Sequence, residues 1–273
     1  MKSLIYDLWA RLFARPAWRK LHSFMLNLAL RGLGVGNCGS DALSGERWLI
    51  SHFLSLRLKG VSEPVFLDVG ANEGQYARQL RNAFPAARIT CFEPGPRTFA
   101  RLEKVAAELR LETVPLAVGA DLGETVLYDY AGTGNASQHA SLVPGVIEQQ
   151  HGGVVEGTPV RITTLDEFCR EHSLACIDFL KIDVEGNELA CLEGARGLLA
   201  RGAIRAIQFE FNSMNLLARV TMSQFYALLA GFDLYRLLPH GLLRLNRADS
   251  VQSNIFAFQN IVALPSSSHR PAQ

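Results

Sequence analysis

Two short stretches decide the fold of this chain: Asp68-Val69-Gly70-Ala71-Asn72-Glu73-Gly74 and Phe92-Glu93-Pro94. The first follows the apolar run 65–67 and precedes a helical-looking segment, residues 75–84. A strand, a glycine turn and a helix in this order are typical of nucleotide-binding α/β folds, whose ligands lie outside the carboxyl ends of the strands. Gly70 and Gly74 permit a tight turn and allow a ligand to approach the main chain.

The second stretch ends the next apolar run, residues 88–92, and places Glu93 at a strand tip roughly twenty residues after the turn, where a ribose diol is expected. The turn lacks the G-x-G-x-x-G pattern, so a bound pyrophosphate is not favoured. Asp68, Glu73 and Glu93 would also repel phosphates. A cationic, phosphate-free nucleoside such as S-adenosylmethionine fits better, the alternative being a plain α/β turn with an ordinary capping acid.

Length and composition restrict the function classes. A chain of 273 residues predicts one large domain, or one domain with an appendage. The net charge of +1 argues against a nucleic-acid partner. The five cysteines contain no C-x-x-C and are expected to be buried, reduced thiols in a cytoplasmic protein. The absence of a long apolar run and of a signal-peptide pattern argues against a membrane span or secretion.

The core of the chain alternates between strand-like and helix-like segments. Strands are expected near 64–69, 87–93, 111–118, 176–184 and 203–211, and helices near 74–84, 96–109, 187–201 and 221–230. Alternation of this kind predicts a parallel sheet with right-handed crossovers. Two further strands, 233–238 and 254–260, are expected to close it as an antiparallel hairpin, which gives an α/β fold with a mostly parallel seven-stranded sheet. An insertion, 119–163, contains a strand-like segment, 125–130, and a long loop, 131–158, of a kind that is often functional.

The first thirty residues differ from the rest. An apolar helical stripe is flanked by basic residues, and Pro16 is expected to separate two helices. The stripe consists of Leu4, Ile5, Leu8, Trp9, Leu12 and Phe13, and the basic residues are Arg11, Arg15, Arg19 and Lys20. A basic amphipathic helix can lie on an anionic membrane surface. Alternatively, the stripe packs on the catalytic domain or on another subunit of a homo-oligomer. The expected divisions are a helical extension at 1–45, a core domain at 46–264 and a disordered tail at 265–273.

Further acidic residues are expected at the same edge of the sheet. The apolar strand before Asp183 delivers Asp183 and Glu185 to its carboxyl end, where they can orient a hydroxyl, act as a base or face the sulfonium of a cofactor. The alternative is that Glu185 stabilises the following helix through its dipole, a role that we assign to Glu188. Glu210 and Asn212 alternate with aromatic residues at the end of the next strand, so both can point the same way, although a buried structural Glu is equally consistent.

Histidine and metal chemistry have weaker support. His139 lies between Ser137 and Ser141 in the insertion loop and can exchange a proton near neutral pH, but a lone loop histidine is more often merely solvated. His151 is weaker still. No zinc-ligand spacing, G-x-S-x-G nucleophile turn or phosphate-binding P-loop is present.

Taken together, four motifs resemble the FkbM family of S-adenosylmethionine-dependent methyltransferases, which have a Rossmann-like class I fold. The motifs are the D-V-G-A-N-x-G turn at Asp68, F-E-P at Phe92, T-L-D-E-F at Thr164, and D-F-L-K-I-D-V-E-G-N-E at Asp178. The resemblance covers roughly 46–258 and departs at Asn187, where the family often has an aromatic residue.

The resemblance implies an activity and a set of site residues. The activity is O-methylation of a hydroxyl on a sugar, glycolipid or polyketide, in bacterial pathways for cell-surface polysaccharides or related compounds. The implied cofactor-binding residues are Asp68, Gly70, Ala71, Asn72, Gly74, Glu93 and Pro94, and the catalytic candidates are Asp183, Glu185, Glu210 and His139. No metal is assigned. Competing hypotheses are a peptide or polyketide acceptor, and a non-catalytic membrane-surface adaptor that retains a nucleoside-binding fold.

Overall fold

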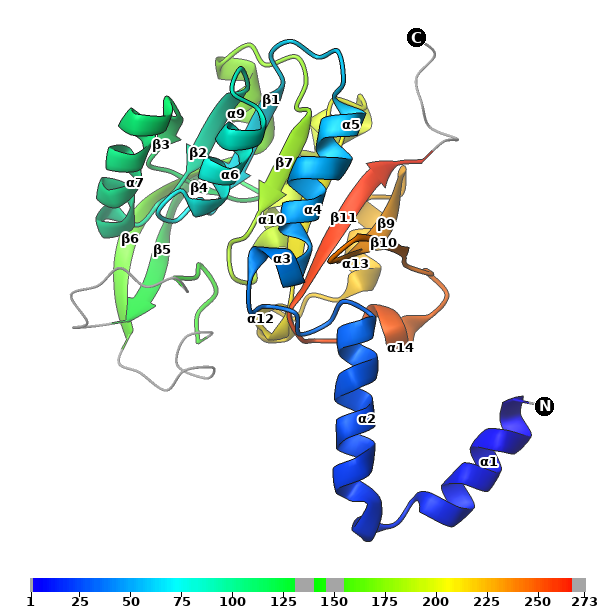
Figure 1. Cartoon of the computed structure of the whole chain (residues 1–273). Coiled ribbons are helices and arrows are strands. Elements are labelled where there is room, and N and C mark those ends of the chain that lie inside the picture. The colour runs from blue at the N-terminus through cyan, green and yellow to red at the C-terminus, as the bar shows by residue number, and fades with distance from the viewer. Residues whose placement is uncertain (1, 131–139, 146–154, 267–273) are drawn as a thin grey trace.

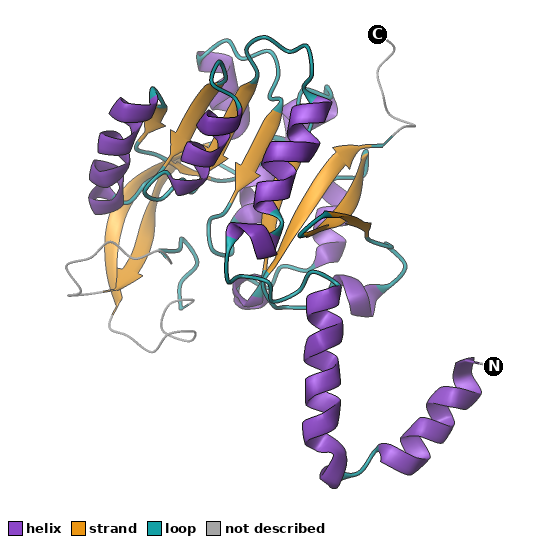
Figure 2. Cartoon of the chain, viewed as in Figure 1, coloured by secondary structure: helices purple, strands orange, loops and turns teal. Residues whose placement is uncertain are grey.

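A twisted eight-stranded sheet with helices on both faces forms the body of the protein (Figures 1 and 2). The computed structural model describes residues 2–130, 140–145 and 155–266. The strand order is β10-β9-β11-β8-β7-β1-β2-β3. The strands of this sheet are β1 (Val65–Val69), β2 (Arg88–Phe92), β3 (Glu112–Val114), β7 (Phe179–Ile182), β8 (Ile207–Phe211), β9 (Phe232–Leu238), β10 (Gly241–Arg244) and β11 (Gln259–Pro265).

The helices follow the predicted alternation. Those of the body are α3 (Asp41–Ser44), α4 (Glu46–Trp48), the π-helix η2 (Leu49–Leu54), α5 (Ser55–Arg57), α6 (Gln75–Ala83), α7 (Pro96–Leu109), α9 (Leu165–Glu171), α10 (Glu188–Glu193), α11 (Arg196–Ala200), α12 (Ser213–Leu217), α13 (Met222–Leu228) and α14 (Ser250–Ser253). The predicted helix at 187–201 is divided into α10 and α11. Gly194 lies at the break, where a Cβ would come within 2.0 Å of the carbonyl oxygen of Gly119.

The pairing confirms the α/β, mostly parallel class. β1 lies between β2 and β7, β7 also pairs with β8, and β2 with β3, all in parallel register. β11 runs antiparallel between β8 and β9. The sheet has one strand more than predicted, because the segment after Leu238 turns back as β10 on the outer edge of β9. The predicted antiparallel pair is β9 with β11, although the second strand lies at Gln259–Pro265 and not at 254–260, and the tight hairpin is β9 with the unpredicted β10.

A second, three-stranded sheet covers the carboxyl edge of the first. The predicted strand 111–118 breaks at Pro115, which has no N–H for a ladder. Its second half, β4 (Ala117–Val118), joins β6 (Val155–Thr163) and β5 (Gly123–Tyr130) in the order β4-β6-β5. The predicted strand at 125–130 is confirmed within β5. β6 begins inside the segment that was predicted as loop. The prediction failed there because Gly157 and Pro159 interrupt the alternating pattern of the strand.

The first two long helices stand apart from the body. α1 (Lys2–Phe13) and α2 (Arg19–Gly32) are joined by the short helix η1 (Pro16–Trp18), as Pro16 predicted. We call residues 2–32 the N-terminal arm. Figure 1 shows the arm leaving the body at the end where α3, α12 and α14 lie, and the apolar stripe of α1 does not pack on the body. Within the described residues, no helix is both long and apolar enough to cross a membrane. The tail 267–273 lies outside the described residues.

Candidate active site

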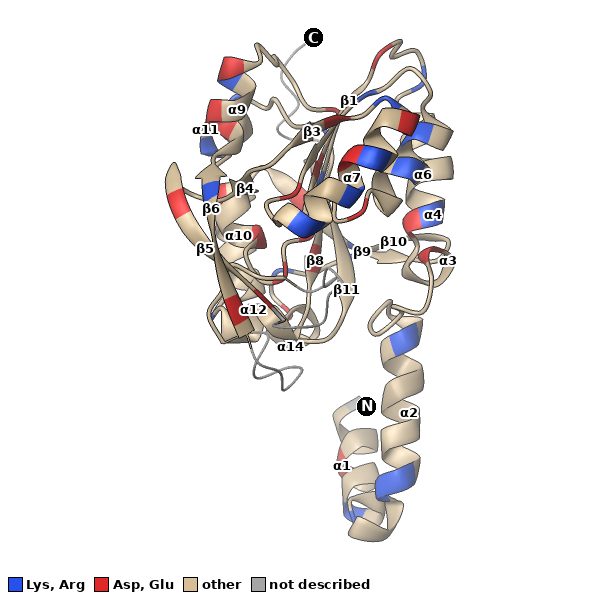
Figure 3. Ribbon diagram, turned by 90° about the vertical axis from the view of Figure 1, so that its left-hand side faces the viewer, with Lys and Arg blue, Asp and Glu red and all other residues tan. Residues whose placement is uncertain are grey.

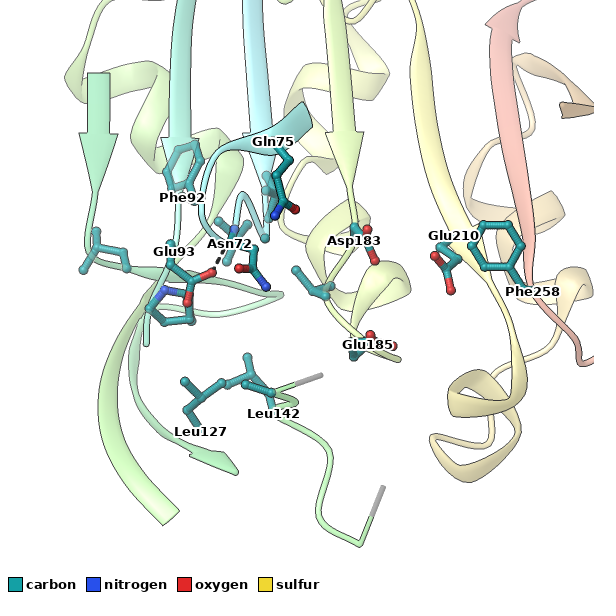
Figure 4. A pocket seen from close by; sticks show the side chains of 18 of the residues that line it. Asn72, Gln75, Phe92, Glu93, Leu127, Leu142, Asp183, Glu185, Glu210 and Phe258 are labelled. Atoms are coloured by element: carbon teal, nitrogen blue, oxygen red, sulfur yellow. Dashed lines mark hydrogen bonds between the residues drawn. The ribbon is translucent and has the colours of Figure 1, made fainter. Parts of the chain in front are cut away.

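A cavity of about 340 Å³ opens at the carboxyl ends of β1, β2, β7 and β8 (Figure 4). The structure brings seven of the predicted site residues to its wall, from four different strand ends. These are Gly70, Asn72, Glu93, Pro94, Asp183, Glu185 and Glu210. Gln75, Leu127, Leu142, Cys38 and Phe258 also line it. His139 lies outside the described residues.

The turn after β1 depends on Gly70. Its φ of +80° is left-handed, and a Cβ there would lie 1.8 Å from the carbonyl oxygen of Asp183, so only glycine fits. The N–H groups of Gly70 and Ala71 both donate to the carbonyl of Phe92, at 3.0 and 2.9 Å. The turn is thereby fixed against the ends of β2 and β7 at once. Gly74, with φ of +81°, donates its N–H to the carbonyl of Ala71 at 2.8 Å and starts α6.

Glu93 is a buried carboxylate held by the main chain. One oxygen accepts the N–H of Asn72 at 3.1 Å, and the other accepts the N–H of Gly95 at 2.8 Å. Burial raises the pKa of Glu93 to about 7, and the two backbone donors act against that rise. Each carboxylate oxygen can accept a second hydrogen bond, which suits two adjacent hydroxyls of a ribose.

Three carboxylates occupy the other half of the cavity. Asp183 accepts a hydrogen bond from the Nζ of Lys181 at 2.9 Å. Glu185 adopts the left-handed region, with φ of +53°, and its carbonyl accepts the Oγ of Ser141 at 2.7 Å. Glu210 accepts the side-chain N–H of Asn212. Its pKa is well above the ordinary value because it is desolvated and because Asp183 and Glu185 repel its charge.

The cavity therefore combines acids with apolar walls. Leu127 of β5 and Leu142 lie across from the carboxylates (Figure 4). Among the described lining residues there is no lysine or arginine. Such a wall disfavours phosphates and favours a cationic ligand with a flat apolar part.

Comparison with known proteins assigns the family. The model of the "Methyltransferase FkbM domain" matches residues 68–229, more than half of the chain. The chain belongs to the FkbM methyltransferase family. This FkbM protein is 29% identical over 190 residues to the 2-O-methyltransferase NoeI of Sinorhizobium fredii, covering 66% of the chain and 76% of that protein. It is 28% identical over 163 residues to the methyltransferase sdnD of Sordaria araneosa, covering 49% and 61%.

Two solved structures match the chain over most of its length. The plantazolicin methyltransferase BpumL in complex with SAH matches with a TM-score of 0.45 and 12% identity, covering 94% of this chain and 93% of that one. Cofactor-bound Rv0187 from MTB matches with a TM-score of 0.44 and 15% identity, covering 96% and 95%.

S-adenosylmethionine is the methyl donor of this FkbM enzyme, and the residues present fit it. Glu93 offers paired acceptors for a ribose diol, and the close contact of Gly70 with the main chain of Asp183 holds the strand ends that line the cavity together. When bound, the donor supplies an electrophilic methyl group on a sulfonium. The acids of the cavity complement that positive charge.

Three predicted cofactor residues lie behind the cavity wall. Asp68, Ala71 and Gly74 do not line it. Asp68 is fully buried, and neither of its oxygens has a hydrogen-bond partner among the described residues. Burial raises the pKa of Asp68 to about 6, although the charge of Lys181 acts against it. Contact between Asp68 and the cofactor stays a prediction.

Sequence reasoning missed a buried polar cluster beneath the site. Lys181 is the register neighbour of Asp68 across β1 and β7, and its Nζ lies 4.9 Å from the centroid of the Tyr76 ring. The Oη of Tyr76 donates to Gln208, which in turn donates to Glu46 at 3.1 Å. The detectable signal was a lysine inside the apolar strand 179–182.

Lys181 supplies the positive charge of this cluster. Burial alone would lower its pKa, but the carboxylates of Asp183, Asp68 and Glu46 raise it above the ordinary value. Lys181 therefore stays charged and compensates the negative charges of Asp183, Asp68 and Glu46.

Glu188, which lies in the first turn of α10 as predicted, has a further role. Its carboxylate accepts the N–H groups of Val184 and Gly186 at 3.2 and 3.0 Å and the side chain of Asn215 at 2.9 Å. It holds the loop that carries Glu185, and does not merely offset a helix dipole. Burial raises the pKa of Glu188 to about 7.

Binding of S-adenosylmethionine is expected to strengthen as pH rises through about 7. The ionised Glu93 accepts hydrogen bonds from both backbone N–H groups and from the ribose hydroxyls. Protonation turns one of its oxygens into a donor, which then faces other donors and loses a hydrogen bond. Titration calorimetry in buffers of different ionisation enthalpy should show proton release below pH 7. Glu93→Gln should weaken binding by about 1.5–3 kcal/mol and remove this proton release. Unchanged affinity in the folded variant would contradict the assignment.

The lysine of the buried cluster is expected to be essential for stability. Lys181→Met leaves buried carboxylates without a counter-charge and should cost about 3–5 kcal/mol in urea unfolding. The matched double variant, Lys181→Met with Asp68→Asn, should recover part of this loss because it removes one of those acids. Equal stability of the single and double variants would show that Lys181 does not compensate Asp68.

Proposed function

We propose that the protein transfers a methyl group from S-adenosylmethionine to a hydroxyl of a sugar or glycolipid, in bacterial cell-surface polysaccharide or related biosynthesis. The observation that carries the proposal is the set of three carboxylates, Asp183, Glu185 and Glu210, that faces Glu93 across one cavity. Carboxylates are common partners for sugar hydroxyls, since they accept hydrogen bonds from them. The similarity to NoeI, a 2-O-methyltransferase by name, supports an oxygen acceptor.

The reaction asks mainly for alignment. Methyl transfer proceeds in line from sulfur to oxygen, so fixing the acceptor hydroxyl supplies much of the acceleration. A base adds about 10²–10⁴ in rate when its pKa lies near the working pH. Orientation of the hydroxyl and removal of its proton fall to two different acids, because their environments differ. Asp183 is held in place by the hydrogen bond from Lys181 and suits orientation, whereas the raised pKa of Glu210 suits proton removal.

The competing hypotheses gain less support. A polyketide or peptide hydroxyl would use the same acids, and no described residue favours either acceptor over a sugar. A non-catalytic adaptor would not require Glu93 and Asp183 to face one cavity. We also propose a cytoplasmic location with peripheral contact at the inner membrane, consistent with five free thiols in the structure.

The acceptor class is tested by transfer of labelled methyl groups to a panel of saccharides and glycolipids. NoeI is named a 2-O-methyltransferase, so the matched control is a 2-deoxy analogue of each sugar acceptor. Labelling of the sugar but not of its 2-deoxy analogue would support the proposal and place the methyl group. Labelling confined to peptide or polyketide hydroxyls would refute the sugar assignment.

The division of roles predicts two different pH profiles in single-turnover assays with the labelled acceptor. Glu210→Gln should lower the rate by about 10²-fold or more and remove the acid limb of the profile. Asp183→Asn should lower the rate by at least about tenfold at every pH, because orientation is lost while the base remains. If Asp183→Asn alone removes the acid limb, Asp183 is the base. If neither variant slows transfer, Glu185 and His139 remain as candidates.

A further inference from the structure

We propose that the N-terminal arm lies on an anionic membrane surface and thereby turns the cavity toward acceptors carried by lipids. The choice of a lipid-borne acceptor rests on the proposed function, whereas binding of the arm to the membrane does not.

Both helices of the arm expose an apolar face. In α1 the face includes Leu8, 57% exposed, and Leu12, 50% exposed, together with Leu4 and Ile5. In α2 it contains residues at i, i+3, i+4 and i+7. These are Leu21, Phe24, Met25 and Leu28. With Phe24 at 61% and Leu28 at 56% exposure, neither face is covered by the body of the protein.

The elbow between the helices is aromatic. The rings of Trp9 and Phe13 lie 4.4 Å apart, and Phe13 meets Trp18 edge to face at 5.2 Å. Trp9 and Trp18 nevertheless remain more than a third exposed. Exposed tryptophans beside an apolar face are typical of segments that settle at the boundary between lipid headgroups and acyl chains.

The positive charge of the arm indicates that its partner is an anionic lipid surface. Residues 1–32 contain six basic side chains and one acid, Asp7. Four of the six cluster around the elbow, at Arg11, Arg15, Arg19 and Lys20, where Figure 3 shows Lys and Arg gathered at the far end of the arm. A second copy of the arm would repel this cluster, whereas anionic headgroups attract it. The 12 residues of α1 and the 14 of α2 are too few to cross a bilayer, so the helices lie in its surface.

The base of the arm is fixed beside the cavity. The N–H of Gly36 donates to the carbonyl of Phe258 at 2.7 Å, and Phe258 itself lines the cavity with Cys38. The fully buried Arg236 donates to the carbonyl of Leu33 at 3.3 Å and to Gln259 at 2.6 Å. The arm thus starts at the carboxyl edge of the sheet, where the active site opens, and a membrane that holds the arm lies on the same side.

The test uses the full chain and co-sedimentation with vesicles of phosphatidylcholine, with and without phosphatidylglycerol. The wild type should bind only the anionic vesicles and be released by salt. Leu8→Asp with Leu12→Asp, and separately Arg15→Glu with Arg19→Glu, should each weaken binding by at least about tenfold. The matched control is Leu56→Asp with Leu122→Asp, two residues that are 64% and 59% exposed outside the arm, and it should bind like the wild type.

A second measurement separates location from chemistry. Transfer to a water-soluble acceptor should be unchanged in the arm variants, while transfer to the same sugar on a lipid in anionic vesicles should fall with vesicle binding. Vesicle binding without transfer to any sugar would support the arm and refute the proposed acceptor. A wild type that ignores anionic vesicles, or a wild-type dimer that Leu8→Asp with Leu12→Asp dissociates without changing vesicle binding, would overturn the proposal.

Discussion

The ammonium group of Lys181 is the charge on which the active site depends. It is buried in the middle of the sheet, donates to Asp183 on the cavity side and faces Asp68 across the β1–β7 register. A cluster of acids at strand ends would otherwise repel itself and take up protons, since desolvation disfavours the charged form of each carboxyl. One buried cation therefore offsets the negative charge of the acids around it, including Asp183 at the edge of the cavity.

A steric constraint gives the same edge its shape. The absence of a Cβ at Gly70 lets the turn after β1 touch the main chain of Asp183, and the N–H groups of the turn bind the end of β2. The three strand ends that carry Asn72, Glu93 and Asp183 are thus held against one another by backbone contacts. Because methyl transfer depends on alignment more than on covalent participation, rigid placement of these groups is the protein's main contribution to the rate.

The sequence was most informative where chemistry and backbone geometry coincide. The glycine turn, Glu93 and the acids after β7 were predicted and do meet in one cavity, because parallel strands end at a common edge. Asp68 was assigned to the same cavity by its motif; it is fully buried beside Lys181 in the β1–β7 register, and its contact with the cofactor stays a prediction. Lys181 and Gln208 were missed because local patterns do not reveal which polar residues of neighbouring strands will pair. The break between β3 and β4 and the strand β6 were missed for a related reason, since Pro115, Gly157 and Pro159 interrupt the alternation and the pairing of β4 and β6 is set by tertiary contacts.

The balance of charge in the cavity follows from the reaction that the family performs. The donor's sulfonium is positive in the ground state and loses its charge as the methyl group leaves. Acids that bind the sulfonium too strongly would therefore stabilise the ground state more than the transition state and slow the transfer. In this protein Lys181 offsets part of the acidic charge from beneath, and burial raises the pKa of Glu210. The acids of the cavity thus face a cationic donor, while the buried cation beneath them limits how strongly they stabilise its ground state.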